Sequence, residues 1–313
     1  MIVTRKLNNL PFDLLSAGSV VTIGSYDGVH VGHMRLLDLV IERARRLGLP
    51  SVVMSFEPTP KEYFSADSPP ARLMCFREKF EALSAYGIDL FFCPRFNAAM
   101  REIEVDTFIR RILLHGLNAT ELVVGDDFRF AKNRTGSIAE IRRAGRAVGM
   151  AISKLQSVIV DDERVSSTAI RLALANGNLD KAKRLLGKPY RMSGKVIQGR
   201  RLGRELGFPT ANVNLNRKQS AVTGIFAARV HGATDRALDS VVSVGTRPTF
   251  HEIKPLLEAY IFDFDGDLYD KRIDVDFIQK LRDEVKFDSA QELVAQMHID
   301  AREARSILEN ERT

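Results

Sequence analysis

The sequence predicts an α/β unit with a doubly wound parallel sheet, followed by a small antiparallel β-barrel with a C-terminal helix. In the first half of the 313 residues, strand-like apolar runs alternate with helix-like patterns, which is typical of parallel βαβ units. In the second half, strand-like segments follow one another with turn residues between them, which favours a barrel or a sandwich. We place the boundary after residue 186, so the predicted domains are residues 1–186 and 187–313.

In the first domain, strand-like and helix-like patterns of apolar residues alternate regularly along the sequence. The expected strands cover residues 19–26, 50–58, 88–94, 119–130 and 151–160, and the expected helices cover residues 34–48, 75–87, 105–117 and 137–150. In such sheets, ligands bind beyond the carboxyl ends of the strands. Four loops lie at such ends, namely residues 24–33, 55–60, 123–130 and the segment leading into 166–171. They could share one crevice.

The second domain follows two short helices expected within residues 167–190, on either side of an Asn-Gly-Asn turn. Its expected strands cover residues 190–199, 224–232, 240–250, 257–264 and 271–282, and a helix over residues 289–310 closes the chain.

Composition narrows the class of partner and the compartment. The formal charge of +6 and the isoelectric point near 9.3 favour anionic partners. The sequence contains no dense block of Lys and Arg, so it does not predict nucleic-acid binding. Cys75 and Cys93 stand in no zinc spacing. The chain shows neither a signal peptide nor a run of the roughly 18–20 apolar residues that a membrane span needs. We therefore expect a cytoplasmic protein with small-molecule partners, without nucleic acid or membrane.

The segment "GSYDGVHVGH" (24–33) joins a strand to a helix and permits three interpretations. Gly24 and Gly32 leave room for a ligand close to the backbone, and a helix starting near Gly32 or His33 would turn its free N–H groups toward an anion. His30, His33 and Asp27 could instead bind a metal, although their spacing matches no zinc signature. A purely structural turn is the third possibility. The strand–turn–helix context favours the anion.

This segment resembles the Gly-Phe-Asp-Gly-x-His-x-Gly-His signature of the nucleotidylyltransferase superfamily, with Tyr26 at the phenylalanine position. "SSTAIR" (166–171) is similar to the second motif of that superfamily. The resemblance implies adenylyl transfer from ATP, with His30, His33, Gly24, Asp27 and Gly32 around the phosphates. It also implies that Ser167, Thr168 and Arg171 close on the triphosphate. Taken alone, "SSTAIR" could equally be an ordinary helix N-cap.

Two further segments carry groups that suit phosphoryl transfer. In "GRRLGRELGFPTANVNL" (199–215), Gly203 and Gly207 alternate with arginines, which suits a loop that covers phosphates. If the piece that follows is extended, Thr210 and Asn212 face one side and offer oxygen ligands suited to Mg²⁺. Glu258 lies on a strand face that is otherwise apolar, which is costly unless the carboxylate is paired or functional. It could serve as a general base. The alternatives are an ordinary proline turn and a paired edge-strand glutamate.

These segments resemble the riboflavin kinase family in "LGFPTANV", "SVGTRPTF", "EAYIFDFDGDLYD" and "LRDEVKF". With the first half, nearly the whole chain resembles the bacterial bifunctional riboflavin kinase/FAD synthetases. The resemblance implies that riboflavin is phosphorylated with ATP to FMN, and that FMN is adenylylated with ATP to FAD with release of pyrophosphate. The resemblance also implies that Thr210 and Asn212 bind Mg²⁺ and the nucleotide phosphates. It implies that Glu258 is the general base and that Arg282 lies near the flavin.

For the adenylyltransferase half, the resemblance brings Asp126 near the nucleotide or flavin and Phe128 near the isoalloxazine, with Mg²⁺ expected at this site too. The sequence departs from the family at Thr59 and Tyr260, where histidine is usual, and at Ala131 and Asp270, where glycine is usual.

Two alternatives to the bifunctional enzyme stay open. One is a riboflavin kinase whose adenylyltransferase half is weakened or lost. The other is a non-catalytic flavin or nucleotide sensor or an RNA-binding regulator, which the presence of Glu258 disfavours.

Overall fold

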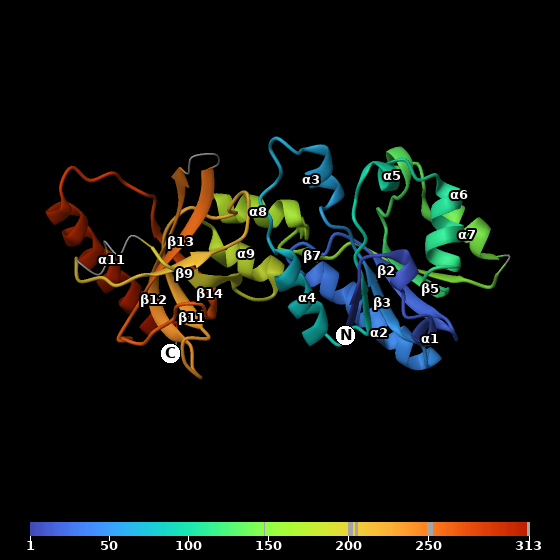
Figure 1. Ribbon diagram of the computed structural model, residues 1–313, viewed down its shortest axis with the longest axis horizontal. Helices are drawn as coiled ribbons and strands as arrows, with labels where there is room; N and C mark the ends of the chain where they lie inside the picture. The colour runs from blue at the N-terminus through green and yellow to red at the C-terminus, as the bar shows by residue number, and fades with distance from the viewer. Residues whose placement is uncertain (147, 200–202, 204–205, 249–252, 312–313) are drawn as a thin grey trace. The chain divides into compact units, whose positions relative to one another are not determined.

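The computed structural model describes residues 1–146, 148–199, 203, 206–248 and 253–311, and its contacts divide the chain into two compact units (Figure 1). The first unit comprises Met1–Pro70 and Phe76–Val165, and the second comprises Ala71–Cys75 and Ser166–Thr313. We describe each unit by itself. The contacts group the helices just before residue 186 with the second unit, and the functional boundary at residue 186 stays a prediction.

The first unit contains a six-stranded, fully parallel sheet in the order β1-β4-β3-β2-β5-β6. Its strands are β1 (Ile2–Thr4), β2 (Ser19–Ile23), β3 (Ser51–Met54), β4 (Leu90–Phe92), β5 (Ala119–Gly125) and β6 (Ala151–Leu155). The predicted α/β class with a parallel sheet is therefore confirmed. The edge strand β1 was not expected, because three residues are too short to show a period.

Helices and short segments connect these strands. They are η1 (Leu7–Asn9), α1 (Phe12–Leu15), α2 (Val31–Leu47), α3 (Pro60–Phe64), α4 (Phe76–Ala85), α5 (Ala98–Arg101), α6 (Val105–Thr107) with its π-helical continuation η2 (Phe108–Leu114), η3 (Lys132–Arg134), α7 (Ile138–Arg146) and the hairpin β7 (Ile159–Val160) and β8 (Glu163–Arg164). Alternate strand residues pack on opposite faces. Val20 and Val123 pack with Val40 of α2, whereas Val21 and Leu122 belong to the larger core that includes η2. Both faces are thus covered, which explains the continuous apolar strands.

The second unit is built on a closed antiparallel barrel in the order β10-β13-β12-β11-β14-β9. Its elements are α8 (Ser167–Ala175), α9 (Leu179–Leu186), β9 (Tyr190–Ile197), β10 (Ala211–Asn214), β11 (Gly224–His231), β12 (Leu238–Pro248), β13 (Ile253–Ile261), β14 (Arg272–Arg282) and α11 (Ala290–Asn310). The predicted barrel with a C-terminal helix is confirmed. β10 lies in the segment whose extended form the sequence left conditional.

The two faces of the barrel wall differ in their neighbours. Val242, Val244 and Leu257 are fully buried inside the barrel, whereas the alternate residues Val241 and Tyr260 pack on the apolar cluster that α11 forms outside it. Side chains on the same parity as Tyr260 therefore face the space between the barrel wall and α11. Glu258 is one of them.

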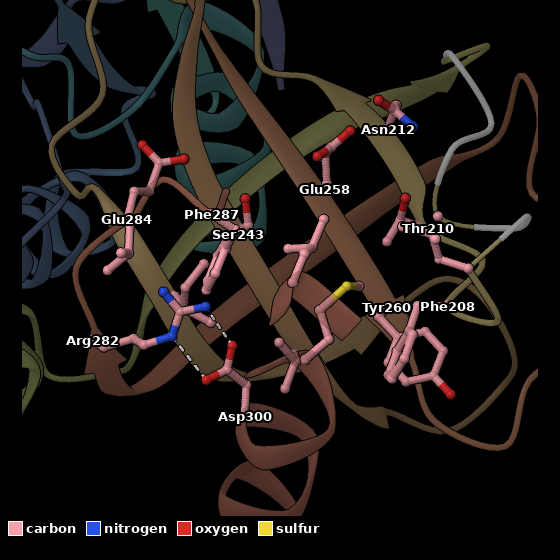
Figure 2. A pocket seen from close by; sticks show the side chains of 17 residues that line it. Phe208, Thr210, Asn212, Ser243, Glu258, Tyr260, Arg282, Glu284, Phe287 and Asp300 are labelled. Atoms are coloured by element: carbon pink, nitrogen blue, oxygen red, sulfur yellow. Dashed lines mark hydrogen bonds and ion pairs between the residues drawn. The ribbon is translucent and has the colours of Figure 1, made fainter. Parts of the chain in front are cut away.

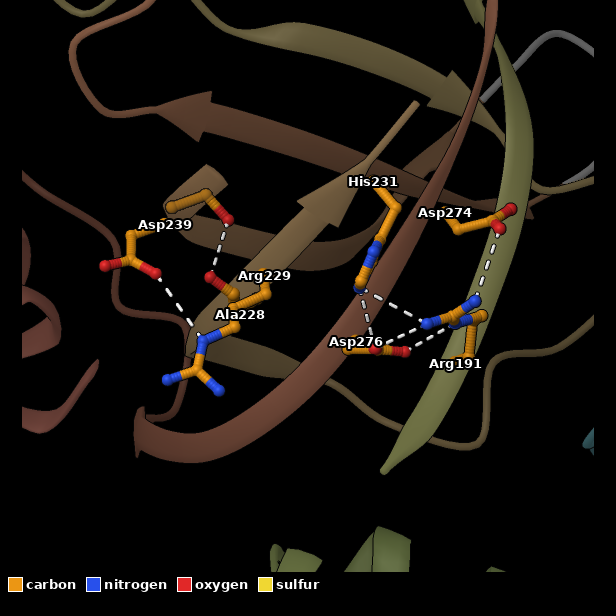
Figure 3. A network of polar contacts seen from close by, with 8 residues as sticks. Arg191, Ala228, Arg229, His231, Asp239, Asp274 and Asp276 are labelled. Carbon is orange, nitrogen blue, oxygen red and sulfur yellow. Dashed lines mark hydrogen bonds and ion pairs between the residues drawn. The ribbon is translucent and has the colours of Figure 1, made fainter. Parts of the chain in front are cut away.

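A polar network ties three barrel strands together (Figure 3). Arg191 of β9 donates two hydrogen bonds of 2.6 Å to the buried carboxylate of Asp276 on β14. His231 Nε2 of β11 lies 2.9 Å from the same carboxylate. The bidentate pair and the imidazole compensate for the cost of burying Asp276.

Candidate active sites

The loop after β2 leads into α2, and its two histidines are held together at the start of that helix. His30 is the N-cap, because its Nδ1 accepts a hydrogen bond of 3.3 Å from the backbone N–H of His33. The helix therefore begins at Val31, slightly before the expected start. An accepting Nδ1 leaves the proton of the neutral ring on Nε2. The rings of His30 and His33 stack with centroids 3.7 Å apart.

Aromatic rings lie close to two glycines of this loop, where a side chain would have to fit. A Cβ at Gly32 would lie 3.2 Å from the ring of His30, and one at Gly24 would lie 3.1 Å from the ring of Tyr26. Tyr26 is fully buried, and its hydroxyl forms a 2.7 Å hydrogen bond with Thr22. The tyrosine at the family's phenylalanine position thus has a partner for its hydroxyl.

Burial keeps the two histidine rings of this loop unprotonated. Loss of solvent lowers the pKa of His30 to about 4, although Asp27 opposes the shift. Loss of solvent also lowers the pKa of His33, and the nearby charges of His30 and Lys79 add to the effect. The rings are therefore neutral hydrogen-bond donors near pH 7. With the N-terminus of the 17-residue helix α2, they form a site suited to phosphate.

A cavity of about 600 Å³ lies in the same unit, at the carboxyl ends of neighbouring strands. It is lined by Ile23 at the end of β2, Phe56 after β3 and Phe128 after β5. Two of the four loops expected to share a crevice, residues 55–60 and 123–130, thus line one cavity, and Ile23 directly precedes a third. The rings of Phe128 and Phe130 stack with centroids 5.7 Å apart. An aromatic wall of this size suits a planar ring system.

Asp126 lies outside the lining of this cavity. Its carboxylate accepts a 2.9 Å hydrogen bond from the hydroxyl of Ser157, and this bond lowers the pKa of Asp126. Its predicted place near the nucleotide or flavin stays a prediction.

The "SSTAIR" motif forms the start of α8 in the second unit. Ser166 is the N-cap and accepts a 3.1 Å hydrogen bond from the N–H of Ala169. Arg171 donates to the carbonyls of Ala71, at 2.6 Å, and Ser167, at 3.1 Å. Thr168 lies in the first turn. The closure of Ser167, Thr168 and Arg171 on the triphosphate stays a prediction.

The four departures from the family have distinct local roles. Thr59 is the N-cap of α3 and forms a capping box with Glu62. Tyr260 packs edge-on against Phe208, with centroids 5.0 Å apart. Ala131 and Asp270 both have positive φ, at 63° and 64°, which explains why glycine is usual at these positions. Asp tolerates this conformation better than Ala does.

Replacing Ala131 with glycine is expected to stabilise the first unit by about 1 kcal/mol. Ala131 combines φ 63° with ψ −173°, a region that costs roughly 1–3 kcal/mol for a residue with a Cβ. The flexibility of glycine in the unfolded chain offsets part of the gain. Urea unfolding checks the value.

Ala139→Gly is the matched control, because Ala139 is exposed in the first turn of the regular helix α7. Glycine there should destabilise by at most about 1 kcal/mol, the cost in a helix interior. Equal destabilisation by both substitutions would show that Ala131 carries no strain.

In the second unit, three polar side chains stand in one row across the outer face of the barrel. Glu258 on β13 is directly opposite Asn212 on β10 and Ser243 on β12. Directly opposed residues have Cβ atoms about 5 Å apart. The row borders a cavity of about 430 Å³ that Thr210 and Arg282 also line (Figure 2).

Most predicted residues of this half thus meet in one cavity. Gly203, Thr210, Asn212, Glu258 and Arg282 all line it. Gly207 does not, although its φ of 84° requires glycine at the turn before Phe208. The arginines at positions 200, 201 and 204 lie outside the described residues.

Asn212 has the features of a cation ligand. Its Oδ1 is buried and has no hydrogen-bond partner among the described residues, and a side chain at Gly199 would overlap its amide. Among those residues, no group of three or more His, Cys, Asp or Glu side chains could hold a metal ion. Amide and hydroxyl oxygens with room for phosphate and water fit Mg²⁺, which rarely takes an all-protein cage.

Arg282 occupies the opposite end of the cavity from Asn212 (Figure 2). It donates hydrogen bonds of 2.9 and 2.6 Å to the two carboxylate oxygens of Asp300 on α11. Gln296, one turn earlier, also donates to Asp300 at 2.9 Å. The guanidinium is therefore held rigidly at the cavity wall.

A second cavity of about 580 Å³ adjoins the first. It is lined by Val196, Ala259, Phe264 and Tyr269, and by Thr210, which lines both cavities.

Sequence reasoning missed three residues at these sites. Asp300 and Glu284 line the cavity of about 430 Å³ beside Glu258, and Lys79 of α4 contacts the loop after β2. Loss of solvent and the nearby Glu258 raise the pKa of Glu284, and its carboxylate occupies the space above Gly245. The quoted segment "LRDEVKF" contained Glu284, whereas Lys79 and Asp300 lie on amphipathic helices without a distinguishing motif.

Each unit contains a ligand-sized cavity and groups suited to phosphate or Mg²⁺. These features define the class of protein as a nucleotide-dependent transferase with two sites. Family models match both parts, FAD synthetase over residues 14–169 and riboflavin kinase over residues 186–308. The chain belongs to the family of bifunctional riboflavin kinase/FMN adenylyltransferases.

Individual relatives agree with the family models. The Escherichia coli K12 bifunctional riboflavin kinase/FMN adenylyltransferase is 43% identical over 97% of each chain. The Haemophilus influenzae enzyme of the same name is 39% identical over 92% of this chain and 94% of its own. The match to the FAD synthetase model leaves the alternative of a lost adenylyltransferase half without support.

One solved structure has the same fold over nearly the whole chain. A Streptococcus pneumoniae protein described as a macrolide-efflux protein superposes with a TM-score of 0.80 at 28% identity, covering 97% of this chain and 98% of its own. Within the described residues, no helix has the length and apolar character that crossing a membrane requires.

Proposed function

We propose that the barrel unit phosphorylates riboflavin to FMN with ATP, and that the first unit adenylylates FMN to FAD with a second ATP. The observation that carries the proposal is the row of Asn212 and Glu258 in a cavity, where the buried Asn212 Oδ1 has no hydrogen-bond partner among the residues that the structure describes. The names of the relatives support the same pair of activities.

In the kinase site, riboflavin occupies the cavity beside Glu258, and the nucleotide occupies the adjoining cavity, so that their reacting ends meet at Thr210. Glu258 accepts the proton of the 5′-hydroxyl as its oxygen bonds to the γ-phosphorus, and ADP leaves. Arg282, held by Asp300, borders the flavin. Such transfers depend mainly on positioning and charge neutralisation.

Thr210 and Asn212 would hold Mg²⁺ together with phosphate oxygens and water. The ion supplies charge neutralisation on the transferred phosphoryl group.

In the adenylyltransferase site, the isoalloxazine of FMN packs in the aromatic cavity against Phe128, and the ATP phosphates lie at the N-terminus of α2. An FMN phosphate oxygen bonds to the α-phosphorus, and the bond between the α-phosphorus and pyrophosphate breaks. The N–H groups of His30 and His33 and of the helix stabilise the negative charge that develops. Ser167, Thr168 and Arg171 would act from α8, and Mg²⁺ is expected here as well.

We also propose that the enzyme works in the cytoplasm on these small molecules, without nucleic-acid or membrane partners. Cys75 and Cys93 are both thiols and not joined in a disulfide, which suits a reducing compartment.

A product assay tests the function. With riboflavin and Mg-ATP, we expect FMN first and FAD later, and with FMN and Mg-ATP we expect FAD and pyrophosphate directly. Accumulation of FMN without any FAD would restrict the function to the kinase. Absence of both products from folded protein would overturn the proposal.

A further inference from the structure

Lys79 is a buried lysine at the loop that carries the two histidines. It belongs to α4, is 2% exposed, and donates a 2.6 Å hydrogen bond from Nζ to the carbonyl of Ser25. The same carbonyl accepts a 3.2 Å hydrogen bond from the hydroxyl of Ser55. Lys79 thus fastens the loop after β2 to α4.

The charge of Lys79 has no counter-ion in the part of the chain that the structure describes. None of the ion pairs there includes Lys79. Asp27, the buried carboxylate of the loop, influences the imidazole of His30. A single carbonyl satisfies one of the three ammonium donors. A buried ammonium without a carboxylate is strongly unfavourable unless another anion compensates for it.

The groups around Lys79 indicate which kind of anion this site suits. The loop that it fastens continues into His30 and His33 and then into α2, whose first N–H groups face the same end. His33 Nδ1 is buried without a hydrogen-bond partner among the described residues. The ammonium is close enough to His33 to disfavour a second positive charge on that ring, which contributes to its lowered pKa. The site therefore combines an ammonium group with histidine rings that burial keeps neutral.

We propose that Lys79 is a positioning residue of the adenylyltransferase site, whose ammonium group the polyphosphate of ATP, and then the leaving pyrophosphate, neutralises. The inference rests on the proposed function of the first unit. It adds to that function a third group, beside the loop that carries the two histidines, that favours the polyphosphate over uncharged ligands. The ligand-free protein bears the cost of the unpaired charge, and the bound anion relieves it.

Lys79→Gln tests the charge separately from the hydrogen bond, because the glutamine amide can still donate to Ser25. The probe is inorganic pyrophosphate with Mg²⁺, titrated by calorimetry into the full-length chain. We expect its affinity to fall roughly 10- to 100-fold and kcat/KM for FAD formation from FMN to fall about 10²-fold. Riboflavin phosphorylation, which belongs to the other unit, should be unchanged.

Stability distinguishes the proposal from a purely structural clamp. Removing an unpaired buried charge should leave the urea midpoint of the ligand-free protein unchanged or raise it. A clamp alone would let Lys79→Gln bind pyrophosphate normally. Lys79→Met, which removes both charge and donor within a similar volume, should lose pyrophosphate affinity at least as strongly, and it serves if the glutamine variant does not fold.

Arg77→Gln is the matched control. Arg77 lies on the same helix, is exposed and pairs with Glu81 at 2.7 Å, so its loss should change neither binding nor catalysis. If wild type makes FAD and Lys79→Gln behaves like wild type, the inference is wrong and the proposed function stands. If wild type makes no FAD but Lys79→Gln still weakens pyrophosphate binding, the anion site stands and the proposed function is wrong.

Discussion

Replacing Glu258 with glutamine is expected to lower riboflavin phosphorylation about 10²- to 10⁴-fold, the range typical for loss of a general base. Glutamine preserves the shape of the side chain opposite Asn212 but cannot accept the proton of the 5′-hydroxyl. Adenylylation of FMN should continue, because Glu258 belongs to the barrel unit. Chromatography of the products from riboflavin and from FMN measures both steps in one preparation.

Glu303→Gln is the control for this substitution. Glu303 is an exposed residue of α11 in the same unit and is absent from the cavity lining, so its replacement should leave both activities intact. A Glu258→Gln variant that phosphorylates riboflavin at the normal rate would remove Glu258 from the role of base.

Replacing His33 with alanine is expected to give the opposite pattern. FAD formation should fall about 10²- to 10³-fold, as when one preorganised donor to a developing negative charge is removed, while FMN formation from riboflavin continues. The loss arises because the ring stacks on His30 and presents a ring nitrogen that has no partner within the described part of the chain. The same two-substrate chromatography measures the result.

The control and a second measurement use the same unit. His115 is exposed at the end of η2, and His115→Ala should keep both activities. Loss of both activities in a folded His33→Ala protein would contradict the assignment of separate sites to the two units.

The lowered histidine pKa values also give His33→Ala a signature in stability. The unfolded chain binds protons near the ordinary pKa of 6.5, whereas the folded chain keeps His30 neutral down to about 4. The histidines therefore contribute stability that is present above pH 6.5 and is lost as pH falls toward 4, by up to about 1.4 kcal/mol per pH unit for each ring. His33→Ala should reduce this slope in urea unfolding measured between pH 7 and 4.5.

The periodicity of the sequence was sufficient for the architecture, because every long element buries a whole face. The parallel sheet, the barrel and α11 follow from apolar residues such as Val21, Leu122 and Val242 recurring at fixed intervals. Local exceptions arise where tertiary contacts decide. The start of α2 depends on a histidine cap, for which no common sequence rule exists, and β1 and β10 are too short to show alternation.

The residues of the two sites also differ in whether the sequence could predict them. Residues within one motif, such as Thr210 and Asn212, could be expected to face a common side once their segment was extended. Residues supplied by remote helices could not. Lys79 reaches its loop across 54 positions of the sequence, and Asp300 reaches Arg282 across 18. Their types and spacings resemble those of ordinary amphipathic helices, so only packing reveals them.

The short strand β1 has a consequence for how the first unit avoids self-association. It covers the outer side of β4, whose residues Leu90, Phe91 and Phe92 are almost completely buried. Backbone bonds of 2.8 Å extend the pairing at both ends, from Ile2 N–H to Asp89 O and from Cys93 N–H to Thr4 O. Without these few residues, β4 would present an apolar edge with free N–H and C=O groups, a template for pairing between molecules. The barrel, being closed, has no such edge. In the parallel sheet, the first four residues therefore protect the side of β4, while β6 forms the opposite edge.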